Sequence, residues 1–86
     1  MTKKTVTVKI DPGCTPKNAA AFTQAAERFA SRITMEMGNR SANAKSIMGV
    51  IALEARPGTA VTVTAEGHDE NEALAAIAAI LEGEEA

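Results

Sequence analysis

The sequence predicts an α+β protein in which a four-stranded antiparallel sheet is covered on one face by three helices, an open-faced β-sandwich. Two observations lead to this class. Apolar residues recur with a period of two in some segments and of about 3.6 in others, and these segments follow in the order β-α-β-β-α-β-α. Each predicted strand has one apolar face, and each predicted helix has an apolar stripe to cover it. With 86 residues, the chain is expected to form a single domain over residues 1–86.

The first strand and the first helix are separated by a clear turn signal. A strand is expected over residues 5–10, where polar residues alternate with Val6, Val8 and Ile10. Asp11-Pro12-Gly13 ends it, because proline lacks a backbone donor and glycine permits a tight turn. A helix is expected from Pro16, with Thr15 as its N-cap. Its apolar stripe contains Ala19, Phe22, Ala26 and Phe29.

The middle of the chain predicts a hairpin followed by a short helix. The second strand is marked by the alternating residues Ile33, Met35 and Met37. Gly38-Asn39 is a turn signal, and Arg40–Ala44 is expected to be a short polar strand. Ser46 is a good N-cap for a helix over residues 47–53, of which Val50 and Leu53 are expected in the core.

The last strand and the last helix follow the break at Arg56-Pro57-Gly58. Val61, Val63 and Ala65 alternate with polar residues and predict the strand. Asp69 is the expected N-cap of the final helix, whose first turn is acidic, as the helix dipole favours. The buried stripe of this helix is expected to contain Leu74, Ile77, Ala78 and Leu81.

Composition excludes several classes of function. A net charge of −2 argues against a nucleic-acid partner, since phosphate binding needs concentrated cations. No apolar run approaches the ~20 residues of a membrane span, and the basic start lacks the apolar run of a secretory signal. The one cysteine suits the reducing cytoplasm. No Cys/His cluster suggests a metal site, and we expect no cofactor.

The string Lys45-Ser46-Ile47-Met48-Gly49-Val50 resembles the regulatory-serine motif of the HPr family, whose members are phosphocarriers of the bacterial phosphoenolpyruvate-dependent sugar phosphotransferase system. A second string, Ala65-Glu66-Gly67-His68-Asp69-Glu70, supports the resemblance, which spans almost the whole chain. The resemblance implies the same open-faced sandwich that the periodicity predicts.

The chain departs from the family at the catalytic loop. The family pattern Gly-Leu/Ile-His-Ala-Arg-Pro-Ala is matched here by residues 13–19. Thr15 stands in place of the phosphate-accepting histidine, Lys17 in place of the arginine and Asn18 in place of the proline. A threonine hydroxyl is a poor nucleophile without a positioned base, and its phosphate would be a low-energy ester. The resemblance therefore predicts neither an enzyme nor a competent histidine phosphocarrier.

Family members of the Crh type also lack the histidine and keep the serine. Likeness to them implies a regulatory protein of carbon catabolite control. A kinase like the HPr kinase/phosphorylase would phosphorylate Ser46 from ATP, and the product would bind a catabolite-control transcription regulator or a metabolic enzyme. Phosphate at a helix start meets free N–H groups and adds about −1.5 to −2 charge. Lys45 and Lys17 are candidate cations for it, and the expected partner-binding residues are Thr15, Lys17, Ile47, Met48 and Ile51.

Each of these residues also has a purely structural interpretation. Ser46 is expected to cap a helix whether or not it is phosphorylated. The apolar residues of that helix can be ordinary core, although we expect Ile47 and Met48 to be partly exposed. Cys14 is expected to pack inward as a small apolar residue, and His68, the lone histidine, to lie on a turn surface. Two other functions remain open: a phosphotransferase-system carrier that uses Thr15 or Cys14, and a binding module with an unrelated role.

Overall fold

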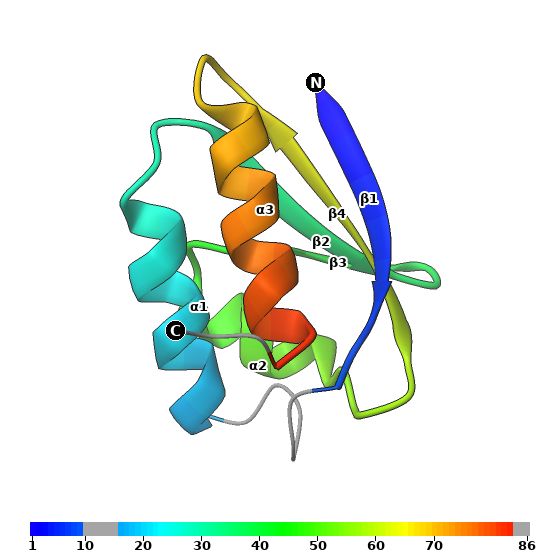
Figure 1. Cartoon of the computed structure of the whole chain (residues 1–86). Coiled ribbons are helices and arrows are strands. Elements are labelled where there is room, and N and C mark those ends of the chain that lie inside the picture. The colour runs from blue at the N-terminus through cyan, green and yellow to red at the C-terminus, as the bar shows by residue number, and fades with distance from the viewer. Residues whose placement is uncertain (10–15, 84–86) are drawn as a thin grey trace.

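The structure, a computed structural model, describes residues 1–9 and 16–83, without the side chains of Pro16 and Lys17. Its elements are β1 (Thr2–Thr7), α1 (Pro16–Glu27), β2 (Arg32–Met37), β3 (Arg40–Asn43), α2 (Ile47–Leu53), β4 (Ala60–Glu66) and α3 (Glu70–Leu81) (Figure 1). The predicted element order is confirmed. None of the helices in these residues is long and apolar enough to cross a bilayer.

The four strands form one antiparallel sheet in the order β1-β4-β2-β3. β4 is the last strand in the sequence, yet it lies inside the sheet, where it pairs with β1 on one side and with β2 on the other. Ala65 of β4 stands opposite Thr2 of β1 and Ile33 of β2. The short polar β3 lies at an edge, where only one neighbouring strand has to be matched.

The core lies between one face of this sheet and the three helices, as the sequence predicts. Inward-facing residues of the strands are buried, while their neighbours along the chain face solvent on the opposite side of the sheet. Figure 1 shows α3 lying along β4 and β1, and α1 packs against both α2 and α3. The largest fully buried side chains include Phe22, Ile33, Met35, Leu53, Ile77 and Leu81.

The bounds of β1 differ from the prediction. The sequence places the strand over residues 5–10, whereas it spans Thr2–Thr7. It ends at Thr7 because its partner β4 begins at Ala60, directly opposite. Val8 is buried as expected, but its N–H donates to the Thr59 carbonyl at 2.8 Å, outside the strand. Ile10 lies outside the described residues. The earlier start escapes prediction because the lysines at positions 3 and 4 break the apolar alternation.

The first helix ends before Phe29, which the helical spacing placed on its apolar stripe. The helix stops at Glu27, and Phe29 packs half-buried against the core from the following connection. Two hydrogen bonds that each span three residues, as in a 3₁₀ turn, close the helix: Arg28 N donates to the Ala25 carbonyl at 3.3 Å and Phe29 N to the Ala26 carbonyl at 3.2 Å. Thr15, the expected N-cap, lies outside the described residues.

Asp69 occupies the N-cap position of α3, but its side chain does not cap the helix. Its carboxylate instead accepts hydrogen bonds from Ala30 N at 2.9 Å, from Ser31 N at 3.0 Å and from the Ser31 hydroxyl. The predicted N-cap position of Asp69 is therefore confirmed, without the capping hydrogen bond that such a residue usually accepts. The connection between α1 and β2 lies close enough to take the carboxylate, and it offers three donors from two adjacent residues.

Asp69 and its neighbour Glu70 are both held in their charged forms. The Ser31 hydroxyl, followed by Ala30 N–H, holds the pKa of Asp69 below its ordinary value. The N–H of Gly67 lowers the pKa of Glu70, helped by the Met1 ammonium at 3.1 Å from Glu70 Oε2.

The connection between α1 and β2 contacts the turn between β4 and α3. We call this contact, formed by Ser31, Gly67 and Asp69, the loop junction.

Candidate functional site at the start of helix α2

Ser46 caps α2 as predicted. Its backbone is extended, with φ −108° and ψ 112°, and its Oγ accepts a hydrogen bond from Gly49 N at 3.1 Å. Val50 N donates to the Ser46 carbonyl at 2.9 Å, which begins the helical ladder. The Ser46 residue is exposed, and in the described part of the chain its hydroxyl makes no other hydrogen bond.

A turn at the end of β3 places Ser46. The Asn43 side-chain Oδ1 accepts from Lys45 N at 2.8 Å, and the Asn43 carbonyl accepts from Ser46 N at 2.9 Å. Asparagine makes such turns readily because its side chain can replace a backbone acceptor. The turn fixes the direction in which the chain enters α2, and so the direction of the Ser46 side chain.

The first residues of α2 form an exposed apolar surface. Ile47 is 44% exposed and Met48 is 76% exposed, as the sequence suggested. Ile51, one turn further, is only half-buried, whereas Val50 and Leu53 are fully within the core as predicted. We call Ile47, Met48 and Ile51 the α2 patch. An exposed methionine adapts to differently shaped partners because its side chain is unbranched and flexible.

Lys45 does not turn its ammonium group toward the helix that follows it. Its Nζ donates to the Phe29 carbonyl at 2.9 Å, just beyond the end of α1. This bond ties the segment that leads into α2 to the connection between α1 and β2. Lys45, which the sequence offered as a cation for a phosphate on Ser46, is therefore already engaged in the unmodified protein.

The remaining predicted site residues are only partly described. Cys14 and Thr15 lie outside the described residues. Lys17 belongs to the first turn of α1, and its side chain is not described. α1 and α2 pack against each other, so the segment that carries Lys17 belongs to the helix beside the α2 patch. His68 is exposed in the turn before α3, as expected of a lone turn histidine. Within residues 1–9 and 16–83, no three Cys, His, Asp or Glu side chains gather as metal ligands would.

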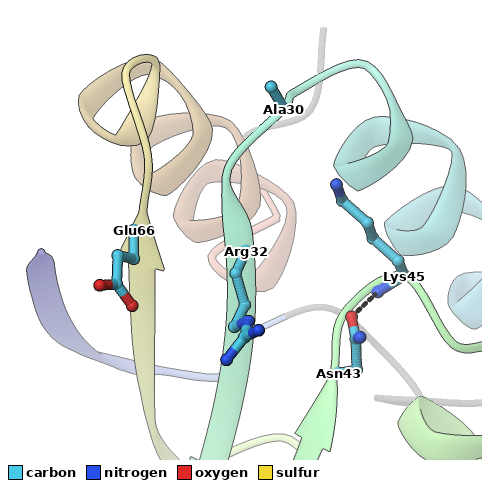
Figure 2. A pocket seen from close by; sticks show the side chains of 5 residues that line it. All are labelled: Ala30, Arg32, Asn43, Lys45 and Glu66. Carbon is cyan, nitrogen blue, oxygen red and sulfur yellow. Dashed lines mark hydrogen bonds between the residues drawn. The ribbon is translucent and has the colours of Figure 1, made fainter.

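A polar depression of about 570 Å³, which the sequence did not suggest, lies where β2, β3 and β4 reach the same end of the sheet. Figure 2 shows Arg32 between Glu66 on one side and Asn43 with Lys45 on the other, with Ala30 at the rim. Arg32 and Glu66 are register partners in the sheet, yet neither side chain has an ion-pair partner among the described residues. The residues that line the depression come from three segments that are distant in the sequence, so no local pattern could have revealed it.

Comparison with known proteins agrees with the observed fold. A family model described as the PTS HPr component phosphorylation site matches residues 2–83. The HPr-like protein Crh of Halalkalibacterium halodurans is 43% identical over 84 residues, which cover 98% of this chain and 100% of that protein.

Two solved structures show the same architecture. The phosphocarrier protein HPr of Bacillus anthracis superimposes with a TM-score of 0.89 at 41% identity, covering 93% of this chain and 95% of that one. The catabolite repression protein Crh of Bacillus subtilis superimposes with a TM-score of 0.80 at 41% identity, covering 100% of this chain and 99% of that one. With a family model over nearly its whole length and relatives above 40% identity, this chain belongs to the HPr family.

Proposed function

We propose that this protein is a non-enzymatic regulator of carbon catabolite control that signals through phosphorylation of Ser46. A kinase of the HPr kinase/phosphorylase type transfers the phosphoryl group from ATP. The phosphorylated protein then binds a transcription regulator or a metabolic enzyme through the α2 patch together with Lys17 and Thr15. The protein works in the cytoplasm and needs no cofactor.

One observation carries the proposal: an exposed serine hydroxyl directly precedes an exposed apolar surface. Ser46 is followed at once by Ile47 and Met48, which are 44% and 76% exposed. A phosphate adds about −1.5 to −2 charge at the border of this surface. Such a local change can create or abolish a docking site without refolding the domain. The names of the Crh relatives, one of them linked to catabolite repression, point in the same direction.

Replacing Ser46 with alanine is expected to abolish labelling by ATP and the kinase, because the accepting hydroxyl is removed. The same change removes the N-cap bond to Gly49, so the free energy of unfolding should fall by about 1 kcal/mol. Ser41→Ala is the matched control, since Ser41 is also exposed and should leave labelling intact. Labelling is followed by intact-protein mass spectrometry, and full labelling of Ser46→Ala would refute the proposal.

The protein is expected not to accept phosphate from phosphoenolpyruvate and Enzyme I, because the Thr15 hydroxyl that replaces the histidine is a poor nucleophile without a positioned base. Mass spectrometry with and without Enzyme I tests this directly, with a histidine-bearing HPr as the positive control. A rapidly formed phosphoprotein modified at Thr15 or Cys14 would favour the carrier function instead.

Met48→Ala is expected to weaken binding of the phosphorylated protein to its regulator about tenfold while changing the free energy of unfolding by less than about 0.5 kcal/mol. The side chain is 76% exposed, so its removal opens no cavity. Lys3→Ala, an exposed change on the opposite face of the sheet, should leave binding unaltered. Titration calorimetry measures the affinity. Equal affinities for wild type and Met48→Ala would remove the α2 patch from the interface.

A further inference from the structure

Gly49 is a glycine that the backbone does not require. In residues 1–9 and 16–83, every glycine except Gly49 has a positive φ angle, from 64° at Gly38 to 155° at Gly67. Gly49 instead lies inside α2 with ordinary helical backbone. In a helix interior alanine is the more favourable residue. A glycine in a helix of seven residues therefore calls for another explanation.

The space around Gly49 supplies that explanation. A Cβ atom at this position would lie 3.2 Å from Ser46 Oγ and 3.4 Å from Ser46 Cβ. The next atom, Ala42 Cβ, would be 3.5 Å away, an ordinary van der Waals contact. The core would thus accept a methyl group, and the one tight contact would be with the hydroxyl that we propose as the phosphoryl acceptor.

We propose that Gly49 is a positioning residue for Ser46, which keeps the space beside Oγ open for an incoming phosphoryl group. This inference rests on the proposed function and adds a second residue to it. The N–H of Gly49 orients Oγ through the 3.1 Å hydrogen bond, and its missing side chain leaves that side of the oxygen uncrowded.

The reaction makes demands on this space. Ser46 Oγ attacks the γ-phosphorus of ATP and forms the Oγ–P bond, while the bond from that phosphorus to the bridging oxygen breaks and ADP leaves. The hydroxyl proton passes to a base of the kinase. Phosphorus and three oxygens must then fit around Oγ, where previously there was one hydrogen atom. A carbon atom 3.2 Å from Oγ occupies part of that volume.

Gly49→Ala separates this role from a structural one. The variant should melt at the same temperature as the wild type or higher, because alanine favours the helix. Its kcat/KM for phosphorylation by ATP and the kinase should fall roughly tenfold. Ala52→Gly is the matched control on the same helix: Ala52 is exposed, so this change should lower the melting temperature and leave the phosphorylation rate unchanged.

A second arm needs no kinase. Two chains of 86 residues carrying phosphoserine at position 46, one with the wild-type Gly49 and one with the Gly49→Ala change, are made by chemical synthesis and ligation, together with their unphosphorylated counterparts. Phosphorylation should lower the melting temperature of the Gly49→Ala chain by about 3 °C or more beyond its effect on the wild-type chain.

The outcomes are distinct. Equal phosphorylation rates for wild type and Gly49→Ala, or equal effects of phosphoserine on the two synthetic chains, would overturn the role of Gly49 and leave the proposed function standing. A wild type that the kinase does not label would overturn the proposed function. The synthetic chains would still decide whether Gly49 makes room for a phosphate.

Discussion

Gly67→Ala is expected to lower the free energy of unfolding by about 3 kcal/mol. At Gly67 φ is 155°, and a Cβ atom would lie 2.7 Å from Ser31 Cα and 3.0 Å from Ser31 Cβ. Ser31 is fully buried and its backbone cannot move aside without disturbing the start of β2. The substitution thus forces apart the two segments that meet at the loop junction. Urea denaturation followed by circular dichroism measures the change.

Gly38→Ala separates the two causes of this loss. Gly38 also has a positive φ, 64°, but nothing lies within 4 Å of the position that its Cβ would take. Its replacement should cost only the backbone strain, about 1 kcal/mol. If Gly67→Ala and Gly38→Ala were equally stable, crowding against Ser31 would not contribute to the loss. That result would contradict the close packing described for the loop junction.

Asp69→Ala is expected to lower the melting temperature by about 5–10 °C. The carboxylate receives Ala30 N–H, Ser31 N–H and the Ser31 hydroxyl, and alanine would leave all three donors without this acceptor. Ser31 is fully buried, so water cannot easily replace the lost acceptor. Ser31→Ala removes only the hydroxyl bond and should cause a smaller decrease. Differential scanning calorimetry at pH 7 compares the three proteins, and an unchanged melting temperature for Asp69→Ala would exclude a stabilising role.

The same carboxylate predicts a pH dependence. Because the pKa of Asp69 is lowered from its ordinary value of 3.8 by folding, the stability that its charge contributes is present above that value and is lost as the pH falls through the folded pKa. The stability advantage of the wild type over Asp69→Asn should be constant at neutral pH and shrink below about pH 4. Glu70 also titrates there with a lowered pKa, but it is present in both proteins and cancels in the difference. A constant advantage down to about pH 2 would contradict the prediction.

Most of the candidate site could be predicted from short stretches of the sequence. Ser46 follows a turn residue and precedes an apolar run, so its place at a helix start could be predicted, and the structure adds the bond from Gly49 N. The exposure of Met48 followed from the shortness of α2, which cannot bury every apolar residue that it carries. The direction of Lys45 could not be predicted, because the acceptor of its ammonium group, Phe29 O, is 16 residues away in the chain.

For the fold, the sequence determines which face of each strand is buried, whereas the tertiary structure determines which distant segments pair. Alternation along β2 and β4 identified which side chains point inward, because that property depends only on neighbouring residues. The sequence also carried the six-residue motif at Ser46 and the absence of a histidine from position 15. Tertiary structure alone decided that β4 lies between β1 and β2, that β1 ends at Thr7, and that Asp69 binds Ser31 in place of its own helix. Each of these features depends on which distant segment packs against the residues concerned. Ser31 and Asp69 are 38 residues apart, and a contact over that distance produces no periodic pattern in the sequence.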